Sequence, residues 1–200
     1  QAPERKMNRF SRPLIVAASL LVAVTAYETS AEELKVVRLS DWRLKRLGQQ
    51  DPDFARILTK AKPSIGTPYV WGGTRLEKGI DCSNFTWQLF QSSGYPYQRF
   101  LSTRTLAVVK ERNGLKKVPF KDARPGDLLV YGYKQGKKWY GHVVILVDKD
   151  GRKSGHKGLV LGAHGGSFKS VQFITYKGYK DGYFKNPRMK LVNVLRVDGM

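Results

Sequence analysis

The chain has 200 residues, with 36 lysines and arginines against 16 aspartates and glutamates, and its formal charge is +20. Since 41% of its residues are hydrophobic and no fixed repeat is present, the composition excludes disordered, collagen-like and repeat architectures and is typical of one globular domain. The single cysteine, Cys82, excludes an intramolecular disulfide framework and a multi-cysteine zinc site.

Residues 1–31 are typical of an export signal. Arg9 and Arg12 follow Met7, which we take as the natural start, and 14–26 is an uncharged, mostly apolar run of 13 residues. A helix needs about 20 apolar residues to span a bilayer, so this run falls short of a membrane anchor. An uncleaved membrane tether or a buried helix is the alternative interpretation.

Small residues precede two possible cleavage sites, after Ala26 and after Ala31, and we favour cleavage after Ala31. The rest of the chain then divides into an N-terminal extension at 32–50 and the main domain at 51–200. Residues 32–200 keep 32 of the basic and 14 of the acidic residues, so a charge of +18 belongs to the mature protein. We expect a periplasmic or extracellular location, where this charge attracts anionic wall polymers or lipid head groups.

Two helices are predicted in the first half of the main domain. Asp51-Pro52 supplies a capping side chain followed by proline at the first helical position, and apolar residues recur at helical spacing to about residue 62. A loop rich in glycine and aromatic residues follows at 66–73, and a second helix is predicted over 83–93. This assignment places Cys82 at a helix N-terminus.

The second half of the chain changes to short runs of Val, Ile, Leu and Tyr between turn residues, a pattern that predicts successive antiparallel strands. The strands are expected at 127–133, 140–147, 159–164, 171–175 and 191–197. The run 143–147 is apolar on both alternating faces, which predicts a central strand covered on each side. Helices followed by a strand meander predict an α+β fold in which the helices pack on an antiparallel sheet.

Cys82 is a candidate nucleophile because the positive end of a helix dipole and a neighbouring imidazole lower the pKa of a thiol. Among the three histidines, His142 and His164 lie at the ends of neighbouring predicted strands, so one imidazole is positioned to take the thiol proton and the other to orient it. His156 lies in a turn rich in glycine and lysine and is assigned no role. From the residues alone, an inert buried cysteine with two structural histidines remains an open alternative.

At these residues the sequence resembles the NlpC-type cell-wall cysteine peptidases of bacteria. The family's motifs occur in its order and at about its spacing between Asp53 and Phe173. They are Gly66–Gly73, Asp81-Cys82-Ser83 with Phe85, Pro125–Leu128, Gly141–Val143 and Ala163-His164. The resemblance implies a papain-like fold, with 51–200 as the catalytic domain.

The resemblance also implies roles for single residues. Cys82 is then the nucleophile, His142 the general base and His164 the polar residue that orients the base. The family's reaction implies attack of the thiolate on the scissile carbonyl, followed by hydrolysis of the acyl-enzyme by water.

Three further residues are expected at the site by the same resemblance. Tyr69 is expected inside it, and Asp81 and Ser83 are expected to line it near the scissile bond. The backbone N–H of Cys82, and the hydroxyl of Tyr69, are expected to hold the oxyanion. This scheme requires no metal and no organic cofactor.

For function, the resemblance implies a secreted endopeptidase or amidase that acts on peptidoglycan stem peptides. The expected bond joins γ-linked D-glutamate to the diamino acid. Two alternatives remain open: a papain-like amidase, acyltransferase or toxin effector acting on another substrate, and a non-catalytic basic domain that binds wall polymer. No specific nucleic-acid partner is expected, and the sequence leaves the oligomeric state open.

Overall fold

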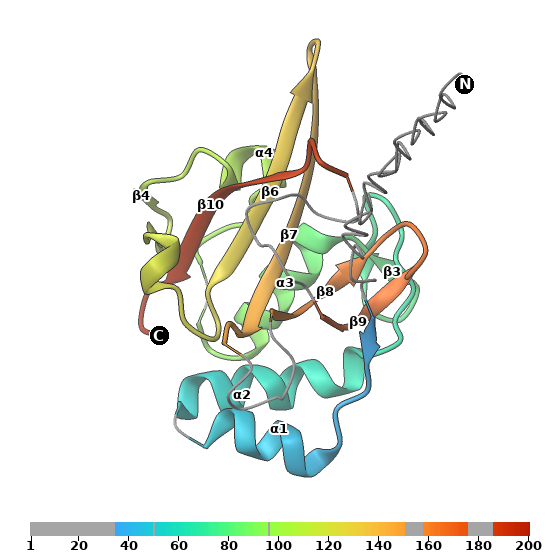
Figure 1. The fold of residues 1–200 in the computed structure, drawn as a ribbon, viewed down its shortest axis with the longest axis vertical. Coiled ribbons are helices and arrows are strands. Elements are labelled where there is room, and N and C mark those ends of the chain that lie inside the picture. Colours follow the sequence, from blue (N-terminus) through green and yellow to red (C-terminus); the bar gives the residue numbers. More distant parts are fainter. Residues whose placement is uncertain (1–34, 50, 96, 151–157, 176–185) are drawn as a thin grey trace, which may run out of the picture. The chain divides into compact units, whose positions relative to one another are not determined.

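The computed structural model describes residues 35–49, 51–95, 97–150, 158–175 and 186–200, and Figure 1 shows their fold. The helices are α1 (Asp41–Gly48), α2 (Pro52–Ala61), α3 (Cys82–Ser92) and α4 (Thr103–Leu106), with 3-10 turns at Lys62–Ser64 and Phe120–Asp122. The strands are β1 (Val36–Val37), β2 (Thr74–Arg75), β3 (Gly79–Ile80), β4 (Glu111–Arg112), β5 (Leu115–Lys117), β6 (Leu128–Gln135), β7 (Lys138–Asp148), β8 (Leu159–His164), β9 (Ser170–Thr175) and β10 (Lys190–Val197).

The predicted α+β architecture is confirmed. Within the described residues the main sheet is antiparallel, with the strand order β1-β9-β8-β7-β6-β10-β5-β4. Helix α3 packs on β7 and β8, and Figure 1 shows it crossing these strands. The nucleophile candidate is therefore carried by a helix that lies directly on the sheet.

Both predicted helices form, and their starts follow from local side-chain chemistry. The Asp51 carboxylate accepts the backbone N–H groups of Asp53 and Phe54, which satisfies two of the donors that open α2. Helix α3 begins at Cys82, one residue before the predicted start. It ends before Gly94, whose φ of 80° is a conformation that glycine adopts at little steric cost.

The prediction of a central strand covered on both sides is also confirmed, for β7. Val143 and Ile145 point into the apolar core shared with α2 and α3. Val144 and Leu146 point into a second apolar cluster on the opposite face of the sheet. Because side chains alternate across a strand, burial on both faces requires the uninterrupted apolar run that the sequence carries here.

The predicted meander is wrong for the last strand, β10. Strands β6, β7, β8 and β9 pair in sequence order as expected, but β10 returns to pair with β6 and β5. It does not lie beside β9, because the free edge of β9 is taken by β1 from the start of the described chain. Strand order is a non-local property, so periodicity along the chain did not reveal it.

The N-terminal part of the described chain packs on the main domain. Within the expected extension at 32–50, β1 pairs with β9 and α1 packs against α2. The expected export signal at 1–31 lies outside the described residues. No helix in the described part of the chain has the length and apolar character needed to cross a membrane.

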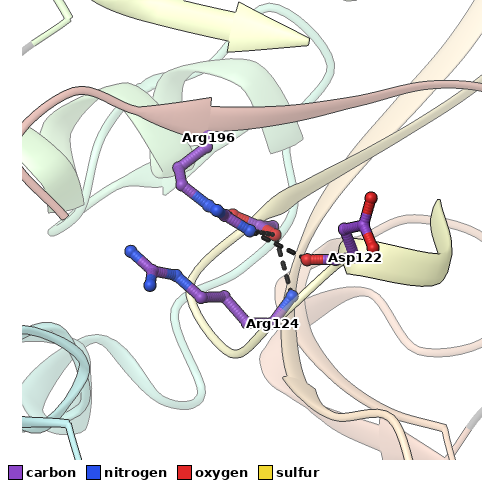
Figure 2. A network of polar contacts seen from close by, with 4 residues as sticks. Asp122, Arg124 and Arg196 are labelled. Carbon is purple, nitrogen blue, oxygen red and sulfur yellow. Dashed lines mark hydrogen bonds and ion pairs between the residues drawn. The ribbon is translucent and has the colours of Figure 1, made fainter. Parts of the chain in front are cut away.

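A buried ion pair ties the C-terminal strand β10 to the turn that precedes β6. Arg196 donates from Nε and Nη2 to the two carboxylate oxygens of Asp127, each at 2.8 Å, and Nη2 also donates to the Asp122 carbonyl at 3.0 Å. The second Asp127 oxygen accepts the Arg124 backbone N–H at 2.8 Å. Figure 2 shows this network, in which the Asp127 side chain is 2% exposed and the Arg196 side chain 15%.

Replacing Asp127 with alanine should lower the free energy of unfolding by about 3 kcal/mol, because the largely buried Arg196 then loses its carboxylate partner and the Arg124 N–H loses its acceptor. Urea denaturation measures this change. The matched control is Asp41→Ala, which breaks an ion pair with Lys62 whose side chains are 80% and 58% exposed and should cost less than about 1 kcal/mol. Equal losses in the two variants would contradict the structural role given to Asp127.

Candidate active site

The start of α3 fixes the backbone of Cys82. The Asp81 carboxylate accepts the Asn84 backbone N–H at 2.7 Å and the Ser83 hydroxyl at 3.0 Å, so it caps the helix. Cys82 is the first residue of the helix, and only 5% of its surface is exposed. The local sequence therefore places the thiol at the helix N-terminus, as predicted.

The thiol lies against strand β7. The backbone N–H of Val143 hydrogen-bonds the Cys82 sulfur, and the N–H groups of Cys82 and Ser83 are directed at it as well. Since His142 directly precedes Val143, the sulfur reaches the strand beside the residue predicted to be the general base. Three backbone donors therefore converge on the sulfur.

The two predicted catalytic histidines lie together on neighbouring strands. The pairing of β7 with β8 includes Ile145 opposite Leu161, and the same register carried along the strands sets His142 opposite His164. Residues that face each other in this way project to the same side of a sheet. Their rings are 5.5 Å apart between centroids, at an interplanar angle of 43°.

A backbone carbonyl fixes the tautomer of His164. Its Nε2 lies 3.0 Å from the Gln172 carbonyl oxygen, and a carbonyl only accepts hydrogen bonds, so Nε2 carries the proton. Burial lowers the pKa of His164 to about 3, an effect partly offset by this hydrogen bond. His164 is therefore neutral near pH 7, and its Nδ1 is a hydrogen-bond acceptor.

Burial also controls the charge of the other two groups. It lowers the pKa of His142 well below its ordinary value, and the charge of His164 lowers it further. Burial raises the pKa of the Cys82 thiol to about 12, against the smaller lowering by the Val143 N–H. The expectation of a lowered thiol pKa is wrong, because desolvation of the buried sulfur outweighs the helix terminus. The resting thiol and the resting His142 imidazole are therefore both uncharged.

Tyr69 lies on the loop before β2, close enough to Cys82 for the two groups to interact electrostatically. Burial raises the pKa of its hydroxyl, and the charges of Cys82 and Asp81 raise it further, so the hydroxyl keeps its proton and remains a donor. A Cβ added to Gly165 would lie 3.1 Å from the Tyr69 ring, which means that the ring packs closely on the backbone after His164. Tyr69 thus lies near both the sulfur and the end of β8.

Asp81 and Ser83 flank the nucleophile in sequence, and their side chains are joined in the helix cap. Their predicted contact with substrate stays a prediction. The contacts made by the Val143 N–H and the Gln172 carbonyl could not be predicted from the sequence, because backbone groups carry no residue signature. Only the strand register would have revealed them.

The comparisons with known proteins agree with this geometry. The profile described as NlpC/P60 family matches residues 66–186, more than half of the chain. The chain belongs to the NlpC/P60 family. The matched range contains Tyr69, Cys82, His142 and His164, so all of the proposed reacting groups lie in the family domain.

Individual relatives match parts of different length. A γ-D-glutamyl-L-lysine dipeptidyl-peptidase of Bacillus subtilis is 36% identical over 83 residues, which are 42% of this chain and 25% of that protein. The bifunctional muramidase/DL-endopeptidase CwlT of the same organism is 26% identical over 155 residues, 76% of this chain and 40% of that protein. The chain therefore spans less than half the length of these relatives.

A solved structure confirms the fold class. A Staphylococcus aureus protein described as similar to a lipoprotein of the NLP/P60 family superposes with a TM-score of 0.51 at 16% identity, over 82% of this chain and 44% of that one. This likeness shows the fold alone. It agrees with the expected papain-like arrangement of a helix on an antiparallel sheet.

The neutral state of Cys82 predicts how the free protein reacts with a thiol reagent. The rate of carboxamidomethylation by iodoacetamide should rise steadily with pH from 5 to 9 and show no plateau, because a pKa near 12 leaves only a small thiolate fraction in this range. Intact-mass spectrometry measures the rate, with glutathione as the reference thiol. An inflection between pH 5 and 7 would reveal a thiolate–imidazolium pair and contradict this result.

Proposed function

We propose that this chain is a cysteine peptidase that hydrolyses peptidoglycan stem peptides, with Cys82 as nucleophile, His142 as general base and His164 as the orienting residue. The observation that carries the proposal is the joint placement of the three groups. The thiol contacts the backbone beside His142, and the His142 ring lies against a His164 ring of fixed tautomer. Membership of the NlpC/P60 family supports the same roles.

The neutral resting state implies that proton transfer accompanies attack. As the Cys82 sulfur bonds to the scissile carbonyl carbon, the thiol proton passes to His142. The Nδ1 acceptor of His164 then stabilises the imidazolium that forms. When the C–N bond breaks, His142 returns this proton to the leaving amine, and a water molecule activated by His142 later hydrolyses the thioester.

The oxyanion of the tetrahedral intermediate requires donors at the helix start. The N–H of Cys82 is directed toward the sulfur. It is therefore proposed to donate a hydrogen bond to the oxygen of the substrate carbonyl that the sulfur attacks. The Tyr69 hydroxyl, kept protonated by its raised pKa, is the proposed second donor. Asp81 and Ser83 support this arrangement through the cap and are proposed to border the substrate near the scissile bond.

We propose the bond between γ-linked D-glutamate and the diamino acid as the site of cleavage. Two relatives carry names that fit this specificity: a γ-D-glutamyl-L-lysine dipeptidyl-peptidase and a DL-endopeptidase. Because peptidoglycan lies outside the cytoplasm, the proposal includes export through residues 1–31 and action by the domain at 51–200. The +20 charge of the chain favours a position near anionic wall polymers or lipid head groups.

Incubation with defined muropeptides tests the reaction and the bond. The unmodified protein should release the diamino acid end of the stem peptide, while Cys82→Ala and His142→Ala should each lower turnover by at least about 10³-fold. Mass spectrometry of the products identifies the bond cleaved, and circular dichroism verifies that each variant is folded. Unchanged turnover in folded Cys82→Ala would exclude the proposed chemistry.

The orienting role of His164 has its own test. His164→Ala should lower kcat by about 10²-fold with little change in KM, because substrate contacts remain while the His142 imidazolium loses its acceptor. His164→Gln, which offers an amide oxygen as acceptor, should recover part of the loss. Equal losses of kcat in the two variants, with both folded, would argue for a purely structural His164.

A further inference from the structure

A groove of about 590 Å³ opens beside the proposed catalytic centre. Gly141, the residue before His142, lines it, and so does Trp71, which is two residues after Tyr69. The remaining lining comes from the start of α4 and from the hairpin that joins β6 to β7. The groove therefore adjoins the segments that carry His142 and Tyr69.

The inner wall of the groove is rigid. The Trp139 indole donates from Nε1 to the Thr103 hydroxyl at 3.3 Å, which joins β7 to α4. A Cβ added to Gly132 would lie 2.1 Å from the indole, and one added to Gly141 would lie 2.4 Å from both Trp139 Nε1 and Thr103 Oγ1. The two glycines thus leave the space that the indole needs, and the ring is held in one place.

The hairpin that borders the groove is held by its own contacts. Strands β6 and β7 pair out to Gln135 opposite Lys138, at the tip. The rings of Tyr133 and Tyr140 stack across the pair, with centroids 5.0 Å apart and an interplanar angle of 12°. The hairpin therefore presents Lys137 and Lys138 from an ordered support at the groove edge.

The chemistry of the lining favours an anionic ligand with an apolar part. Arg104, Lys137 and Lys138 all line the groove, the lining contains no carboxylate, and none of the three is ion-paired with another described residue. Trp71 is 78% exposed, an unusual state for a tryptophan. Three unpaired cations beside an exposed indole match a peptide that carries a free carboxylate.

We propose that this groove is the leaving-group subsite and that Arg104 and Lys138 bind a free carboxylate of the diamino acid side of the substrate. The assignment rests on the proposed function, in which His142 protonates the leaving amine. The leaving-group half of the substrate must therefore lie near the His142 imidazole. Gly141, the residue before His142, lines the groove at this position. Trp71 covers the apolar stem of the same residue.

Steady-state kinetics on two synthetic stem peptides tests this assignment. The peptides are identical except that the diamino acid ends in a free α-carboxylate or in a carboxamide. The double variant Arg104→Gln/Lys138→Gln should raise KM for the carboxylate peptide by about tenfold, while KM for the carboxamide changes less than about twofold and kcat changes little for either. Equal changes for the two peptides would overturn the proposal.

The matched control is Lys60→Gln/Lys116→Gln, which removes the same charge from exposed positions on α2 and β5 that do not line the groove. It should leave both KM values within about twofold of the unmodified protein. If it reproduces the effect of Arg104→Gln/Lys138→Gln, overall charge and not the groove governs binding, and the subsite is rejected.

Calorimetry on the Cys82→Ala protein separates the subsite from the reaction. It should bind the carboxylate peptide more tightly than the carboxamide, and the Arg104→Gln/Lys138→Gln changes should abolish that preference. This result without any cleavage by the unmodified protein would reject the proposed function and retain the groove. Polyphosphate serves as a probe for anionic wall polymers. If the Arg104→Gln/Lys138→Gln changes lower the affinity for polyphosphate but leave the affinity for both peptides unchanged, the peptide subsite is rejected in favour of a surface for wall polymers.

Discussion

The contact between the start of α3 and strand β7 is the constraint on which the rest of the site depends. Asp81 closes the helix start, and the Val143 N–H holds the sulfur against the strand. Because the Val143 N–H belongs to a strand and Cys82 is the first residue of a capped helix, the position of Cys82 follows from the packing of a helix on a sheet. His142 directly precedes Val143 on the same strand, so the backbone of the proposed general base lies next to the residue whose N–H holds the sulfur.

Burial determines the protonation states of the groups around this contact. The same packing that positions Cys82 and the two histidines removes them from water, and each of the three pKa values moves toward the uncharged form. A neutral site avoids the cost of keeping an ion pair in the interior before substrate arrives. In the proposed reaction, charge develops only during attack, and the helix N–H groups and the His164 acceptor are proposed to stabilise it. The basic residues that give the chain its +20 charge are proposed to attract anionic ligands at the groove and on the surface, outside this buried site.

Much of the fold was predictable because its signals are local. Asp51 and Pro52 mark the start of α2, and the uninterrupted apolar run in β7 indicates a strand buried on both faces. Strands β1, β4 and β5 are only two or three residues long, too short to show a periodic pattern in the sequence. β1 and β5 form by pairing with β9 and β10, which lie far along the chain, and β4 pairs with β5. Helix α1 is similar, since its Ser40 makes no side-chain cap.

The site divides in the same way. Cys82, His142 and His164 were predicted as catalytic candidates because reactive side chains are visible in a sequence and their motifs resemble a known family. The direction of the thiol pKa shift was predicted wrongly, because it depends on how completely the sulfur is buried once α3 packs on the sheet. The aromatic groove was missed as well. It combines Trp71, Arg104 and the β6–β7 hairpin, which only the folded chain brings together.

The protonation states of the two histidines test the central claim most directly. Long-range ¹H–¹⁵N NMR of the imidazole nitrogens, recorded from pH 5 to pH 9, distinguishes the neutral tautomers from the imidazolium. Both rings should remain neutral throughout, with the proton of His164 on Nε2. An imidazolium at His142 near pH 7, or a His164 proton on Nδ1, would contradict a neutral, pre-oriented site.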